Sequence, residues 1–102
     1  MNNDDINRYE AEAVGSAVHW AKTGIGYFTM EQKVNDYIEA TGANRSVGSD
    51  KEAILHGRRA AALRINIMSI SELSKAEEQK LHDRLIEIAE EGAMQQRSGM
   101  HR

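Results

Sequence analysis

The segment that decides the fold runs from Ser49 to Ile70 and reads SDKEAILHGRRAAALRINIMSI. Ser49 and Glu52 have the spacing of a capping box, in which each side chain bonds the other residue's backbone amide, so a helix is predicted to begin there. Its apolar residues form two separate stripes, whereas a surface helix needs only one. The first stripe contains Ile54, Ala61, Ile65 and Met68, and the second contains Ala53, Ala60, Leu63 and Ile67. We therefore expect a central helix with neighbours on two sides.

A first helix is predicted over residues 4–22, on the amino-terminal side of the central segment. Asp4 or Asp5 can cap its start. Gly24 can end it, because glycine tolerates the left-handed conformation that often closes a helix. Apolar residues recur every three or four positions and are expected to face the core. They are Ile6, Tyr9, Ala13, Ala17 and Trp20.

A second, shorter helix is predicted over residues 30–41. Thr29 and Gln32 have the spacing of a second capping box, which places the helix start at Met30. Gly42 is expected to end this helix, and a polar turn follows over residues 42–49. The residues expected to face the core are Met30, Val34, Tyr37 and Ile38.

A last helix is predicted over residues 75–96, with Ser74 and Glu77 as a third capping box. Its narrow apolar face contains Leu81, Leu85, Ile88, Ala89 and Gly92. The connection from the central helix is short, so these two helices are expected to lie antiparallel. The sequence thus predicts an all-α fold, a small four-helix domain over residues 1–96 with helices three and four forming an antiparallel hairpin. Residues 97–102 are predicted to form a flexible carboxy-terminal tail.

Composition argues against several classes of protein. A chain of 102 residues is expected to form one domain. It has no cysteine, which excludes disulfides and thiolate metal sites. The four histidines lack the spacing of a zinc motif, and no serine lies in a nucleophile elbow. We therefore expect no enzyme activity, no metal and no other cofactor. No apolar run is long enough for a membrane span, and the acidic start differs from a signal peptide, so we expect a cytoplasmic protein without membrane contact.

Charge is unevenly distributed along the chain, although the net charge is only −3. Residues 44–64 carry five cations against two acids, whereas residues 71–91 carry seven acids against three cations. One explanation is that the two segments neutralise each other, with Arg58 and Arg64 pairing with glutamates such as Glu78 or Glu87. The other is that the cations of the central helix bind a ligand. The sequence leaves both open.

Two cationic regions are candidate ligand sites. Arginine side chains bind phosphate and carboxylate groups through paired hydrogen bonds. The loop KTGIGYFT, residues 22–29, combines two glycines, a lysine and a helix start, which are the ingredients of an anion site, although a plain helix–helix turn explains them as well. Its tyrosine is able to stack on a base. The candidate ligand-binding residues are Lys22, Tyr27, Thr29, Arg45, Arg58, Arg59 and Arg64.

Three functions remain in contention. The first is a non-catalytic, homo-oligomeric binding protein that holds an anionic, nucleotide-like ligand at a cationic seam on the helix over residues 49–70. The second is an adaptor or inhibitor that docks a helical face, such as the acidic last helix, onto a larger protein. The third is a helix-turn-helix regulator that binds DNA, against which the long linker and the net negative charge both count. The second apolar stripe of the central helix fits either a second copy or cover by the first helix.

Overall fold

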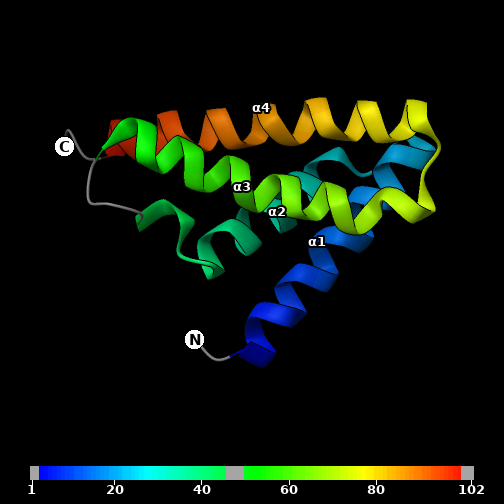
Figure 1. The fold of residues 1–102 in the computed structure, drawn as a ribbon, viewed down its shortest axis with the longest axis horizontal. Coiled ribbons are helices and arrows are strands. Elements are labelled where there is room, and N and C mark those ends of the chain that lie inside the picture. The colour runs from blue at the N-terminus through cyan, green and yellow to red at the C-terminus, as the bar shows by residue number, and fades with distance from the viewer. Residues whose placement is uncertain (1–2, 46–49, 100–102) are drawn as a thin grey trace.

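The computed structural model describes residues 3–45 and 50–99, and these residues form an all-α domain (Figure 1). The α-helices are α1 (Asn3–Thr23), α2 (Tyr27–Ala40), α3 (Lys51–Ser69) and α4 (Lys75–Gly99), and the 3-10 turns are η1 (Ala43–Arg45) and η2 (Ile70–Glu72). Helices α3 and α4 lie antiparallel along the long axis of the molecule, joined by η2 (Figure 1). The predicted four-helix fold and its hairpin are therefore confirmed.

The molecule is flattened, with principal extents of 40 × 27 × 19 Å. Helices α1 and α2 form a second closely packed pair, and α1 crosses to contact both members of the α3–α4 hairpin. In the part of the chain that the structure describes, no helix combines the length and the apolar character needed to cross a membrane. Because the shape is shallow, each helix has one face near the core and another near solvent.

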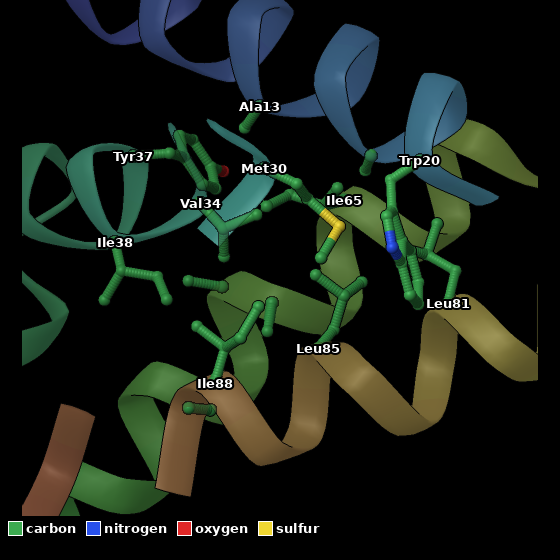
Figure 2. Packing of buried hydrophobic residues seen from close by; sticks show 14 of the residues in the cluster. Ala13, Trp20, Met30, Val34, Tyr37, Ile38, Ile65, Leu81, Leu85 and Ile88 are labelled. Atoms are coloured by element: carbon green, nitrogen blue, oxygen red, sulfur yellow. The ribbon is translucent and has the colours of Figure 1, made fainter. Parts of the chain in front are cut away.

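The apolar faces predicted for α1, α2 and α4 meet in one core (Figure 2). On α1, the small side chains of Ala13 and Ala17 are fully buried, which allows neighbouring helices to approach closely. Trp20 lies beside Leu81 of α4 at one end of this core (Figure 2). The other large core residues are Met30, Val34, Tyr37, Ile38, Ile65, Leu85 and Ile88. Ala61, Ala62 and Ile65 of α3 belong to this core, and the other buried residues of its inner face are Ile54, Arg58, Asn66 and Ser69.

Two helices begin with local caps close to those predicted. The N-cap of α3 is Asp50, whose Oδ1 accepts hydrogen bonds from the amides of Glu52 at 2.9 Å and Ala53 at 3.2 Å. Ser49, the predicted cap, lies outside the described residues. The box that starts α4 is confirmed, because the Ser74 amide donates to Glu77 Oε1 at 2.9 Å and the Glu77 amide donates to Ser74 Oγ at 3.2 Å. The hydrogen bond from Ser74 lowers the pKa of Glu77. Helix α4 continues to Gly99, beyond its predicted end.

The predicted start of α2 at Met30 is wrong, because the helix begins at Tyr27. Gly26 adopts the left-handed conformation, with φ of 84°. Its carbonyl accepts a hydrogen bond from the amide of Met30 at 3.0 Å. That hydrogen bond already closes the first helical turn, so the box expected from Thr29 and Gln32 does not form the cap. Only glycine adopts this backbone conformation without a steric penalty. Thr29 therefore lies inside the first turn of α2, with an exposed side chain.

Candidate functional site

Arg58 projects from α3 into the protein and is only 3% exposed. Its Nε donates to the carbonyl of Ala89 on α4 at 3.1 Å. Its two terminal nitrogens donate to side-chain amide oxygens, Nη1 to Asn44 of η1 and Nη2 to Asn35 of α2. The guanidinium thus bonds three different elements, and we call this cluster of four residues the Arg58 cage. A ligand could use Arg58 only by displacing these bonds.

The electrostatics of the Arg58 cage fit a structural cation. Burial lowers the pKa of Arg58, and the negative charge of Glu39 acts in the opposite direction. An arginine nevertheless stays charged in a protein, so its donors need acceptors. The guanidinium occupies the space that a Cβ of Gly92 would fill, so glycine at this position lets α4 approach it. The absence of a side chain at Gly92 is therefore a condition for the cage to form.

The other two arginines of α3 form ion pairs at the protein surface. Arg59 Nη2 lies 3.3 Å from Glu90 Oε1 on α4, as expected for pairing between the basic and acidic segments. Arg64, in contrast, donates to Glu10 Oε2 of α1 at 2.9 Å. The expectation that Arg58 and Arg64 pair with Glu78 or Glu87 is wrong, because α4 reaches only one flank of α3 and Glu87 instead pairs with Arg84 at 2.6 Å.

Glu10 Oε2 accepts hydrogen bonds from one exposed residue and one buried residue. Besides the hydrogen bond from Arg64, this oxygen accepts a hydrogen bond from the Tyr37 hydroxyl, and the two oxygens lie 3.0 Å apart. Burial, followed by the hydrogen bond to Glu10, raises the pKa of Tyr37 to about 12. Glu10 in turn raises the pKa of Arg64. Arg64 is thus held at its flank of α3 by a carboxylate that also serves a buried phenol.

The turn between α1 and α2 holds the remaining predicted ligand residues whose side chains are described. Lys22 and Thr29 are exposed, and Tyr27 packs edge-on against Trp20 with ring centroids 5.8 Å apart. Two cations of α4 lie over these rings, Lys80 at 4.5 Å from the Trp20 centroid and Arg84 at 5.3 Å from that of Tyr27. Burial is the main cause of the raised pKa of Tyr27. Sequence reasoning missed both α4 cations, because no local pattern links them to a turn so distant in the chain.

The seven predicted ligand residues therefore do not converge on one place. Lys22 and Tyr27 lie at the end of the molecule near Lys80, whereas Arg58 and Arg59 contact α4 around Ala89 and Glu90, about 15 Å further along that helix. Arg45 lies in η1, and its side chain is outside the described part. Anion binding stays a prediction, and it requires Arg59 and Arg64 to exchange glutamate partners for the ligand.

The second apolar stripe of α3 is only partly covered within the described residues, because Ala53 and Leu63 are half-buried and the other two members are exposed. Ala60 is exposed, and Ile67 is 68% exposed. The expectation that α3 has neighbours on two sides is therefore met by α4 and α1, but neither helix covers Ala60 or Ile67. Helix α4 packs on the flank that carries Arg59 and α1 on the flank that carries Arg64, which leaves the surface between them open. Met68, expected in the buried stripe, is also 42% exposed.

The open surface of α3 has a regular spacing. Ala53, Ala60 and Ile67 are seven residues apart, as are His56, Leu63 and Ile70. Two such interleaved series are the pattern of a coiled-coil seam, the side of a helix that packs along another helix. We call these six residues, the last of which belongs to η2, the outer face. The second stripe predicted from the sequence already contains four of these residues, Ala53, Ala60, Leu63 and Ile67, and lacks only His56 and Ile70.

A hollow of about 400 Å³ opens beside the carboxy-terminal end of the outer face. It is lined by Asn66, Ile70, Lys75, Glu78, Gln79 and His82. Asn66 is only 8% exposed, and its Oδ1 has no hydrogen-bond partner in the described part of the chain. The lining contains both a cation and a carboxylate, so it shows no preference for ligand charge.

Comparisons of the chain with protein-family models, with curated proteins and with solved structures find no match. Within residues 3–45 and 50–99, no three histidine, aspartate or glutamate side chains are grouped so as to hold a metal ion. The surfaces described above are thus the grounds on which a function can be argued.

Proposed function

We propose that this is a non-catalytic helical binding protein that self-associates through the outer face of α3. The observation that carries the proposal is the exposure of Ile67, 68%, on a helix whose opposite face buries an arginine. Isolated exposed aliphatic residues are common, but a stripe that repeats along a whole helix is typical of an interaction surface. Covering a side chain such as Ile67 stabilises an assembly by about 1.5–3 kcal/mol.

The spacing of the outer face indicates the kind of partner. A seven-residue repeat matches another helix lying nearly parallel or antiparallel to α3. Ala53 and Ala60 carry small side chains, so the backbone of that helix can approach closely. A second copy of the chain supplies a helix with the same repeat, and symmetric pairing of identical surfaces is the commonest form of assembly. Self-association needs no ligand and leaves the Arg58 cage undisturbed.

The size of the outer face indicates a weak, reversible complex. Helix α3 has 19 residues, so the face is about 28 Å long. A strip of this length and one helix wide falls short of the roughly 800 Å² per partner that stable complexes bury. We expect a monomer–dimer equilibrium with a dissociation constant on the order of micromolar.

Sedimentation velocity between about 1 µM and 1 mM protein tests the proposal. The wild-type sedimentation coefficient should rise with concentration. Ile67→Lys should raise the dimer dissociation constant at least about tenfold, because a lysine amine would be buried in an apolar seam. Ile25→Lys is the matched control, because Ile25 is 67% exposed in the turn between α1 and α2, away from the outer face, and it should leave the constant unchanged. A wild-type chain that stays monomeric throughout, or equal effects of both variants, rejects the proposal.

A further inference from the structure

Resting on this proposed self-association, we infer that the two copies pack their α3 helices antiparallel about a two-fold axis, with Glu52 of each copy paired with Lys75 of the other. Three observations support this arrangement. They are the sizes of the side chains along the outer face, the positions of α1 and α4 on its flanks, and the charges at its two ends.

Side-chain size along α3 changes from small at its beginning to large at its end. An antiparallel two-fold arrangement centred near Ala61 and Ala62 places Ala60 of one copy opposite Leu63 of the other. The same operation places His56 opposite Ile67 and Ala53 opposite Ile70. Each layer then contains one large aliphatic residue, and the total volume varies little along the seam. A parallel pair would place alanine against alanine at one end and isoleucine against isoleucine at the other, leaving voids in the alanine layers.

The flanks of α3 determine which charges face each other across the seam. A two-fold axis perpendicular to the helices brings each flank against the same flank of the other copy. On the flank covered by α4, Glu52 then lies level with the other copy's η2, immediately before the start of its α4 at Lys75. Both side chains are exposed, and neither takes part in an ion pair within the described residues. The symmetry forms this Glu52–Lys75 pair twice.

Neighbouring registers are less favourable. Sliding the second copy by one heptad in one direction brings the two Arg64 side chains together and carries Glu52 about 10 Å past the other copy's η2. Sliding it in the opposite direction carries Ile67 and Ile70 past the first turn of the other helix, so that both stay exposed. Like charges in contact oppose pairing and apolar contact favours it. The register with Glu52 level with the other copy's η2 avoids both losses.

Charge reversal tests the pairing at low salt by sedimentation velocity. Glu52→Lys and Lys75→Glu alone should each weaken the dimer about three- to tenfold, because an attraction present twice becomes a repulsion. The protein carrying both changes should return to within about twofold of the wild type, since the pairs re-form with reversed polarity. Lys33→Glu is the control for Lys75→Glu, because Lys33 lies on α2, where it pairs with Glu12 of α1, and is no part of the seam. Failure of the double variant to recover rejects the register.

Disulfide trapping tests the orientation independently, since the chain contains no cysteine of its own. Ala53→Cys protein mixed with Ile70→Cys protein should cross-link faster than either variant alone, because a disulfide needs Cα atoms within about 7 Å. Faster cross-linking of each variant with itself would show a parallel pair and overturn the inference. If Ile67→Lys weakens the dimer while both of these tests fail, the outer face is the interface but the register is wrong. A monomeric wild-type chain rejects the proposed function together with the inference.

Discussion

The two faces of α3 are opposite in character to those of an ordinary surface helix. The inner face carries Arg58, which is 3% exposed, whereas the outer face carries Ile67, which is 68% exposed. A helix that needed only to cover a core would place its charge outward and its aliphatic residue inward. The contrast teaches that the two faces have separate roles. The Arg58 cage positions α2, η1 and α4 within one copy, and the outer face contributes little to the folding of that copy.

The Arg58 cage is better understood as positioning its neighbours than as adding net stability. Transfer of an ion from water into a protein costs several kcal/mol, and hydrogen bonds offset much of that cost. The partners are two side-chain amides and one backbone carbonyl, from three elements that must all be in place for the guanidinium to be satisfied. A misplaced α2 or α4 would leave buried donors unpaired. The cage therefore selects one packing of the helices.

The largest expected loss of stability comes from adding a methyl group at Gly92, against the inner face of α3. Gly92→Ala places a Cβ where the Arg58 guanidinium lies, so that group must move and break its hydrogen bonds. We expect the free energy of unfolding to fall by about 2–3 kcal/mol, measured by urea denaturation. Gly15→Ala is the control, because no atom lies within 4 Å of its added Cβ, and it should raise stability by up to about 1 kcal/mol through helix propensity. Similar stabilities for both variants would show that the cage is not rigid.

A second effect tests the burial of the Tyr37 hydroxyl, which donates to Glu10. The pKa of Tyr37 is raised to about 12 in the folded protein, so the folded state holds its proton more tightly than the unfolded state, in which the pKa is about 10. This contribution is complete below pH about 10 and is lost as the pH rises to about 12. Over that range, the free energy of unfolding should fall less steeply for Tyr37→Phe than for the wild type. Parallel pH profiles would contradict the raised pKa of Tyr37, which follows from its burial first and from the Glu10 hydrogen bond second.

A smaller effect is expected at the two flanks. Arg59 and Arg64 form exposed ion pairs, so Arg59→Gln should lower the free energy of unfolding by less than about 1 kcal/mol, and Arg64→Gln should lower it only slightly. The same variants test the anionic-ligand hypothesis in a thermal-shift assay with ATP at low salt. Because both arginines already have glutamate partners, we expect ATP to leave the melting temperature unchanged. An ATP-dependent rise that either variant abolishes would favour the anion site.

The smallest expected effect on stability is on the outer face. Ile67→Gln should change the free energy of unfolding of the monomer by no more than about 0.5 kcal/mol, because the side chain already lies in solvent. Urea denaturation well below the dimer dissociation constant measures this. A large loss of stability in the monomer would show that Ile67 serves the fold of one copy, and the contrast between the two faces would disappear.

Features with a local cause could be predicted from the sequence. The core-facing residues of α2 follow from their spacing, and the Ser74–Glu77 capping box involves residues only three positions apart. The start of α2 was mispredicted for an equally local reason. Two signals compete there, and the left-handed Gly26 begins the helix before the Thr29 box can act.

The candidate sites were harder to predict, because their partners are distant in the chain. Nothing in the spacing of Asn35 and Asn44 indicates that their side chains surround Arg58, and Glu10 lies far along the sequence from Arg64. The outer face is a different case. Its seven-residue repeat is visible in the sequence, but the sequence alone did not show that α1 and α4 would leave it uncovered.

The shared Glu10 oxygen makes Tyr37 a natural reporter. This single atom accepts hydrogen bonds from both the buried hydroxyl of Tyr37 and the exposed guanidinium of Arg64. Any molecule that draws Arg64 away changes the charge felt by the phenol. The ring resonances of Tyr37 therefore provide a built-in spectroscopic probe of events on the α1 flank of α3, and no dye or label has to be attached.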